Sequence, residues 1–259
     1  MKMPHRPSVL SVGLALVAGL IIALLVIPLR TPERLPDFDA IGDVDTRKQA
    51  FFAFLAPLVE AENERVMYDR ARLLALNERL ESGQALGGRD RHWLKRMAGH
   101  YDVEWHRDDP VRVMQQLARR VDTVPVSLAL VQAAAESGWG RSRFAVDGNN
   151  LFGQWCYTRG CGMVPSRRAG GAQHEVESFV SVRESVSRYI HNLNTHSAYA
   201  PLREIRARLR EADREPTAMV LADGLIRYSE RREDYVEEVK SVIRVNRPLI
   251  EQVIHQSPN

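Results

Sequence analysis

Cysteine is scarce in this chain, and its two cysteines, Cys156 and Cys161, share one glycine-rich loop. Two thiolates without a nearby pair of histidines do not make a zinc site, and His174 is the candidate for a third ligand. The sequence therefore predicts no bound metal and no cofactor. In an oxidising compartment the spacing favours a small disulfide loop, whereas in a reducing one both thiols stay free.

The chain also lacks a dominant charge sign, internal repeats and low-complexity tracts. Its net charge is +3 and its pI is about 9.0, with basic and acidic residues interleaved throughout. Such a mixed surface argues against a nucleic-acid-binding face. The 259 residues are enough for one core of ordinary size plus an extension.

One long apolar run stands near the start, from Val9 to Leu29. It is long enough to cross a hydrocarbon core of ~30 Å as a helix. No small-x-small cleavage site follows it, so residues 1–30 are expected to form an uncleaved signal anchor. The flanking positive charges are nearly balanced, and the short leader favours an inside N-terminus. We therefore expect a single-pass inner-membrane protein whose main domain lies in the periplasm.

Proline and aspartate make residues 31–45 a linker, and helical periodicity follows it. Asp45 or Thr46 is expected to cap a long amphipathic helix that ends near Ser82, with Thr46 and Gln49 as a capping box. This helix opens a helical extension at 46–110. Its apolar stripe either packs against the domain or serves a coiled-coil partner.

The rest of the chain is expected to be mainly α with a small β lobe, an α+β fold. Residues 154–179 lack helical periodicity, and the alternation from His174 to Phe179 favours a strand. Helix starts are expected at Asp90, Asp109–Pro110, Val124–Pro125, Ser181 with Glu184, Pro201, Pro216 and about Glu233.

Glu136 is the strongest candidate for chemistry. It ends the run 126–135, which is apolar almost all round, as in a buried helix. Gly138 and Gly140 then let the backbone turn away. A carboxyl placed there is partly desolvated, so its pKa should rise, as a general acid near neutral pH requires. The alternative is a glutamate at a helix end that points into water.

The order of motifs around Glu136 resembles a known family. The sequence AAAESGWGRS at 133–142, followed by NNLFG at 149–153, is similar to the glucosaminidases, which include flagellar muramidases and many bacterial autolysins. The paired-cysteine loop that follows resembles the Bax-type, membrane-anchored branch. Further matches run in order between about 124 and 250: His174-Glu-Val, Ser181 to Ser185 with Tyr189, and Arg227 to Tyr235. The resemblance implies a lysozyme-like domain at 111–259, with two lobes around a saccharide cleft.

The resemblance also implies roles for individual carboxylates. Glu136 matches the family's catalytic acid. Glu175 is the preferred second carboxylate, ahead of Glu177, while Glu184 is expected to cap its own helix. Alternatively, the 2-acetamido group of an N-acetylated sugar acts as the nucleophile, and no strong second carboxylate is needed.

Other residues are candidates for binding a sugar. Tyr228 and Tyr235 stand where the family has its paired tyrosines, and they either contact the N-acetyl sugar or cover a helix junction. Asn150 is expected to shape the turn after the Glu136 helix, with a sugar contact as a second role. Trp139 and Trp155 are either a stacking platform or packing residues.

The predicted function is that of a peptidoglycan hydrolase. It would be an endo-β-N-acetylglucosaminidase that acts on glycan strands and cleaves β-1,4 glycosidic bonds by general acid catalysis. The alternatives are a muramidase or lytic transglycosylase on the same fold, and a non-catalytic wall-binding scaffold.

Overall fold

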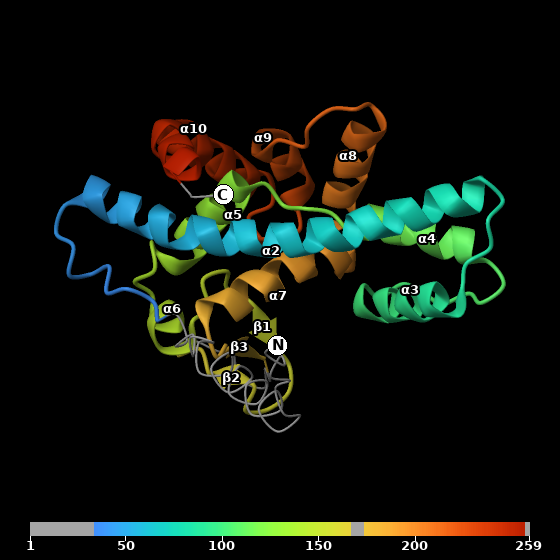
Figure 1. The fold of residues 1–259 in the computed structure, drawn as a ribbon. Helices are drawn as coiled ribbons and strands as arrows, with labels where there is room; N and C mark the ends of the chain where they lie inside the picture. The colour runs from blue at the N-terminus through green and yellow to red at the C-terminus, as the bar shows by residue number, and fades with distance from the viewer. Residues whose placement is uncertain (1–33, 167–173, 257–259) are drawn as a thin grey trace, which may run out of the picture. The chain divides into compact units, whose positions relative to one another are not determined.

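The computed structural model describes residues 34–166 and 174–256 (Figure 1). The chain divides into two units, 1–33 and 34–259, and all the described residues belong to the second. The predicted signal anchor at 1–30 lies outside the described residues. Within the described ranges, no helix combines the length and apolar character needed to span a membrane.

Helix α2 (Val44–Glu81) is the long amphipathic helix that the sequence predicts, with a different cap. The Asp43 carboxylate accepts hydrogen bonds from the Thr46 backbone N–H at 2.7 Å and from the Thr46 hydroxyl at 2.6 Å. The expected cap at Asp45 or Thr46 is therefore wrong. The helix starts earlier because Asp43 takes the capping bond and uses the Thr46 hydroxyl as well.

The apolar stripe of α2 is buried in the hydrophobic core of the domain. Phe51, Phe52, Leu55 and Val59 are fully buried, and the helix contacts α4, α5, α7 and α10. Core packing is therefore the observed role of this stripe. The predicted extension at 46–110 and the predicted catalytic segment at 111–259 share one core.

The remaining helices follow in chain order. They are α3 (Gly88–His100), α4 (Pro110–Arg120), α5 (Val126–Ser137), α6 (Arg143–Gly148), α7 (Val182–Thr195), α8 (Ala200–Glu211), α9 (Ala218–Leu221) and α10 (Glu233–Gln256), with 3₁₀ turns at Ser197–Tyr199 and Ala222–Leu225. Most start where the sequence predicts, including α4, where Asp109 is the cap and Pro110 follows it. Ser181 likewise caps α7, and Glu184 accepts a hydrogen bond from the Val180 N–H at 2.9 Å.

Two details of the helices differ from expectation. Helix α3 begins after Gly87, which has no side chain to cap it. Asp90 lies in the first turn instead, and its carboxylate pairs with Arg79 at 3.0 Å and Arg72 at 3.6 Å. Helix α6 was not expected. It is too short to show an apolar period, and its one local signal is Ser142, whose hydroxyl accepts a hydrogen bond from the Ala145 N–H at 3.2 Å.

The β lobe is a small antiparallel sheet of three strands. Its strands are β1 (Trp155–Cys156), β2 (Gly162–Met163) and β3 (Glu175–Glu177), and their order in the sheet is β1-β3-β2. Trp155 and Met163 both pair with Val176 from opposite sides, so β3 is the central strand. The expected fold class, mainly α with a small β lobe, is confirmed.

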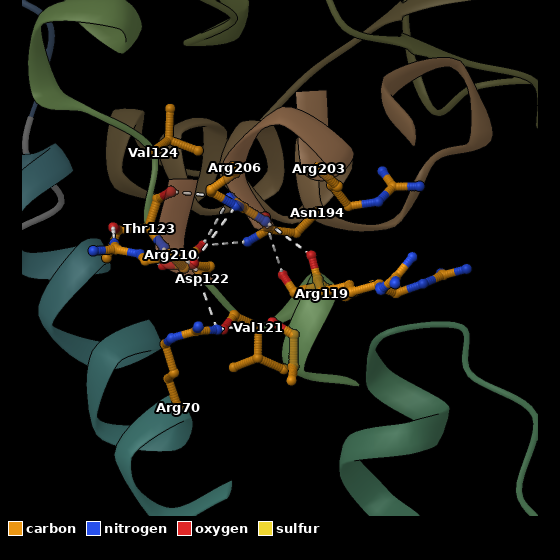
Figure 2. Close-up of polar contacts among 12 residues, drawn as sticks. Arg70, Arg119, Val121, Asp122, Thr123, Val124, Asn194, Arg203, Arg206 and Arg210 are labelled. Atoms are coloured by element: carbon orange, nitrogen blue, oxygen red, sulfur yellow. Dashed lines mark hydrogen bonds and ion pairs between the residues drawn. The ribbon is translucent and has the colours of Figure 1, made fainter. Parts of the chain in front are cut away.

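An arginine network anchors the loop that leads into α5 (Figure 2). Arg206 on α8 is 1% exposed and donates hydrogen bonds to the carbonyl of Thr123 at 2.9 Å and to the side chain of Asn194 at 2.7 Å. Arg210 donates two hydrogen bonds to the Asp122 carboxylate, at 3.2 and 3.1 Å. Arg70 on α2 lies 3.5 Å from the same carboxylate. These contacts hold α2, α7 and α8 against the start of α5.

Candidate active site

Glu136 is the penultimate residue of α5, at the point where the buried helix ends in a glycine turn. Gly138 terminates the helix with a left-handed backbone (φ 57°), and Gly140 follows at φ 77°. A Cβ on Gly140 would lie 2.6 Å from a ring carbon of Phe38, so this position excludes larger residues. The Gly-Trp-Gly sequence therefore turns the chain sharply away and leaves Glu136 at the edge of the core.

The Glu136 carboxyl is half-buried, and burial raises its pKa above the ordinary value. A hydrogen bond from Tyr235 and the more distant charge of Arg231 offset part of that rise. Gly153, the last residue of the NNLFG sequence, stands directly against this carboxyl. A Cβ added to Gly153 would lie 3.3 Å from Glu136 Oε2, and its φ of +63° also favours glycine. The two halves of the sequence motif therefore meet at the acid.

A chain of buried hydrogen bonds leads to Glu136. The Tyr189 hydroxyl donates to Gln132 Oε1 at 2.7 Å, and Gln132 Nε2 donates to the Tyr235 hydroxyl at 3.0 Å. Tyr235 in turn donates to Glu136. Burial raises the pKa of the Tyr235 hydroxyl far above the ordinary value, so this group stays protonated and remains a donor. The donors all point the same way, toward the acid.

Tyr228 contacts both Tyr235 and the loop that carries Gly153. Its ring stacks on that of Tyr235 with centroids 5.3 Å apart, and its hydroxyl donates to the Phe152 carbonyl at 2.9 Å. Phe152 itself stacks on Tyr189, with centroids 4.0 Å apart. The tyrosines therefore hold the loop that places Gly153 against Glu136.

Glu175 lies in β3, and its side chain contacts the loop that the two cysteines close. Cys156 and Cys161 form a disulfide bond, which confirms that prediction. The Glu175 carboxylate, 5% exposed, accepts hydrogen bonds from the backbone N–H groups of Gly160 at 3.1 Å and Gly162 at 2.9 Å. This geometry shapes the loop between the cysteines. A catalytic role for Glu175 stays a prediction.

The same three side chains resemble a set of metal ligands. The sulfurs of Cys156 and Cys161 and a Glu175 oxygen lie within 4.8 Å of one another. Sulfurs joined in a disulfide offer no thiolate, so this set does not suit a metal ion. His174, the candidate third ligand, stacks on Trp155 instead.

Comparison with known proteins agrees with this arrangement. Residues 111–247 match the glucosaminidase family, described as mannosyl-glycoprotein endo-beta-N-acetylglucosaminidase. The chain is 36% identical to protein bax of Escherichia coli (strain K12) over 216 residues, which cover 83% of this chain and 76% of that protein. This chain belongs to the glucosaminidase family. Within that family it is of the Bax type, and no solved structure matches it.

In this glucosaminidase domain, the predicted sugar-binding residues Tyr228 and Tyr235 make the internal contacts described above, and Asn150 and Trp139 are likewise committed to internal contacts. Asn150 is 2% exposed and donates to the carbonyls of Gln154 at 2.9 Å and Glu177 at 2.8 Å, which confirms that it shapes the turn. The Trp139 ring packs against Phe52, with centroids 5.2 Å apart. Sugar contacts by Asn150, Trp139, Tyr228 and Tyr235 stay predictions.

Two residues of the candidate site, Gln132 and Tyr189, are not identified as site residues by the sequence. Gln132 is fully buried one helical turn before Glu136, so the two share a face of α5. A glutamine in an otherwise apolar helix was the available signal, because a buried amide needs partners. Its partners come from α7 and α10, which local sequence does not reveal.

Proposed function

We propose that this protein is a peptidoglycan hydrolase, an endo-β-N-acetylglucosaminidase that cleaves the β-1,4 bond following N-acetylglucosamine. Membership of the glucosaminidase family indicates a glycoside hydrolase that acts on glycan. The observation that supports general acid catalysis in this proposal is the half-buried Glu136, whose pKa is raised by burial. A pKa raised by burial favours the protonated form of this carboxyl, which is the form that a general acid needs.

Glu136 would protonate the glycosidic oxygen as the bond to the leaving sugar breaks. The charge left on its carboxylate is then stabilised by the Tyr235 hydroxyl, which Gln132 and Tyr189 hold in place. A buried donor fixed in advance stabilises the ionised product state without reorganisation. The hydrogen-bonded chain of Tyr189, Gln132 and Tyr235 therefore stabilises the negative charge that Glu136 acquires when it gives up its proton.

The opposite side of the sugar needs a nucleophile or a base. Glu175 already accepts two backbone hydrogen bonds, and Glu177 lies 3.5 Å from Arg188. This favours the substrate's own 2-acetamido group as the nucleophile, as in substrate-assisted glycosidases. We further propose that the domain is lysozyme-like, and that residues 1–30 anchor it in the inner membrane with the domain in the periplasm.

Digestion of purified sacculi tests the proposal. The full-length protein is incubated with sacculi, the soluble products are reduced, and mass analysis identifies the reducing-end sugar. N-acetylglucosamine ends are expected. N-acetylmuramic acid ends would identify a muramidase, an anhydro product a lytic transglycosylase, and no release above a control without protein a non-catalytic scaffold.

The anchor has its own test. The full-length protein should sediment with membranes, resist extraction by salt, and be digested by protease added outside the cytoplasmic membrane. A soluble mature form that lacks residues 1–29 would overturn the anchor and leave the enzymatic proposal standing.

A further inference from the structure

Trp155 in β1 is a large aromatic residue that lies outside the hydrophobic core. The residue is 53% exposed, while one face of the indole lies flat on the imidazole of His174. The two ring centroids are 4.2 Å apart and the ring planes differ by 6°. Because His174 covers one face, the exposed surface belongs to the other face and the edges of the indole.

The sheet holds this pair of rings in a fixed orientation. Trp155 pairs with Val176 across the β1–β3 ladder, and His174 precedes Val176 by two residues. Side chains two apart in an extended strand point to the same face, so Trp155 and His174 are diagonal neighbours. The stack therefore presents a rigid, flat aromatic surface to solvent.

Trp155 is also connected to the surroundings of Glu136 through Gly153. Gly153 stands against the Glu136 carboxyl, and Trp155 is two residues further on. Two peptide units span at most about 7.6 Å between Cα atoms, so the backbone that carries the indole lies within a few sugar units of the Glu136 carboxyl. Trp139 differs in this respect, since its ring is packed against Phe51 and Phe52 of α2.

An exposed indole in the neighbourhood of the candidate acid suits a pyranose ring. The faces of a β-linked N-acetylglucosamine unit carry C–H groups, while its hydroxyls project from the rim. Such a face packs on a flat aromatic ring and leaves the polar rim in water, which is the amphipathic contact that tryptophan favours. An exposed aromatic surface without such a ligand gives the fold little stability.

We propose that Trp155, supported by His174, is a sugar-stacking subsite for an N-acetylated pyranose of the glycan strand beside the bond that Glu136 protonates. The proposal rests on the proposed function, because it assigns a part of the same substrate. Trp155 binds the sugar directly. His174 positions the indole.

Binding is measured with full-length Glu136→Gln protein, so that no hydrolysis occurs. The probes are β-1,4-linked N-acetylglucosamine oligomers from dimer to hexamer, titrated by calorimetry and by tryptophan fluorescence. In this background Trp155→Ala should weaken binding of the longer oligomers about tenfold, which corresponds to one lost aromatic contact. Trp155→Phe should keep most of the affinity, since it keeps a flat ring.

Two further variants sharpen the test. Tyr68→Ala removes an aromatic side chain on α2 that is 75% exposed, and it should leave binding unchanged. His174→Ala should weaken hexamer binding less than Trp155→Ala and reduce the fluorescence anisotropy contributed by Trp155. His174→Phe, which keeps a stacked ring, should restore both.

The outcomes separate this proposal from the proposed function. If Trp155→Ala binds every oligomer as tightly as its parent, or if the parent binds no hexamer, the subsite is wrong even when wild-type protein digests sacculi. If binding depends on Trp155 but wild-type protein releases no products, the subsite stands and the enzymatic proposal fails.

Discussion

Asp122 and Glu136 are two carboxylates near opposite ends of the same buried helix, and their surroundings give them opposite properties. Asp122, just before α5, is 2% exposed and faces three arginines. Burial by itself raises the pKa of Asp122, but Arg206 and Arg210 outweigh it and hold the pKa below the ordinary value. Burial raises the pKa of Glu136, and there the hydrogen bond from Tyr235 offsets only part of the rise.

The difference shows what separates a structural carboxylate from a catalytic candidate. Charged partners keep Asp122 ionised, and burial in turn lowers the pKa of Arg206 to about 10. Such a pair joins helices but has no proton to give. The neutral tyrosine beside Glu136 stabilises the ionised carboxylate, but its hydrogen bond does not outweigh the effect of burial on the pKa. Partner charge, more than depth of burial, therefore decides which carboxylate can exchange a proton.

Glu136→Gln should have the largest effect on activity. The amide keeps the shape but cannot donate a proton, so wall hydrolysis should fall by about 10²–10⁴-fold. The pKa of Glu136 is higher in the folded state than in the unfolded state, where it is about 4.3. The stability that Glu136 contributes is therefore fully present below the unfolded pKa and is lost as pH rises through the folded pKa. The variant should therefore be as stable as wild type or slightly more stable at neutral pH. Turnover on sacculi and thermal unfolding measure both quantities.

The matched control is Glu230→Gln, the same change at an exposed position near Tyr228. It should leave turnover unchanged. A folded Glu136→Gln protein with most of the wild-type rate would mean that this carboxyl is structural.

Asp122→Ala should have the largest effect on stability. Removing one partner of a buried ion pair leaves Arg206 uncompensated, so the free energy of unfolding should fall by about 3–5 kcal/mol. The activity of the molecules that remain folded should change little. Denaturant unfolding at pH 7, with turnover measured per folded molecule, checks both expectations.

Asp122→Asn tests the electrostatic part while it keeps the shape. A lowered folded-state pKa contributes stability above the unfolded pKa of about 3.9, which is lost as pH falls through the folded pKa. Wild type should therefore lose its advantage over this variant below about pH 4. A stability difference that does not depend on pH would contradict this account of Asp122.

Tyr235→Phe should have an intermediate effect, visible mainly in the pH profile. The lost hydrogen bond lowers the pKa of Glu136 in wild type, so its removal should raise that pKa further. Activity that needs protonated Glu136 should then persist to higher pH, so the alkaline limb of kcat/KM moves upward. Gln132 also loses a buried partner, which should cost about 1–3 kcal/mol of stability.

Tyr228→Phe is the control for that shift. Its hydroxyl donates to the Phe152 carbonyl, so the variant should lose some stability but keep the alkaline limb in place. Equal shifts in both variants would show that loop packing, rather than the Tyr235 hydrogen bond, sets the pKa of Glu136.

Glu175→Gln should have the smallest effect on catalysis. Both carboxylate oxygens accept backbone N–H groups of the disulfide loop, so the variant should lose about 1–3 kcal/mol of stability and less than about tenfold in turnover. Turnover measured at a temperature where the variant is fully folded decides the matter. A loss as large as that of Glu136→Gln would make Glu175 an essential base and remove the need for the acetamido route.

The helical class, most helix starts and the choice of Glu136 as the candidate acid follow from residue order. Local rules are enough here, because a cap such as Asp109 or Ser181 acts on backbone groups within one turn. The cap of α2 was misplaced because Asp43, Asp45 and Thr46 all suit that role. Helix α6 was missed because it is too short for its pattern to show.

The partners of each polar side chain were decided by the tertiary structure. The sequence gives Trp139 and Trp155 the same two possible roles. In the structure the Trp139 ring packs against α2, whereas Trp155 stacks on His174 and is exposed to solvent. The opposite pKa directions of Asp122 and Glu136 likewise depend on groups from α2, α8 and α10, far away in the chain. Burial and charge at a site are sums over neighbours in space, and no local pattern in the sequence specifies those neighbours.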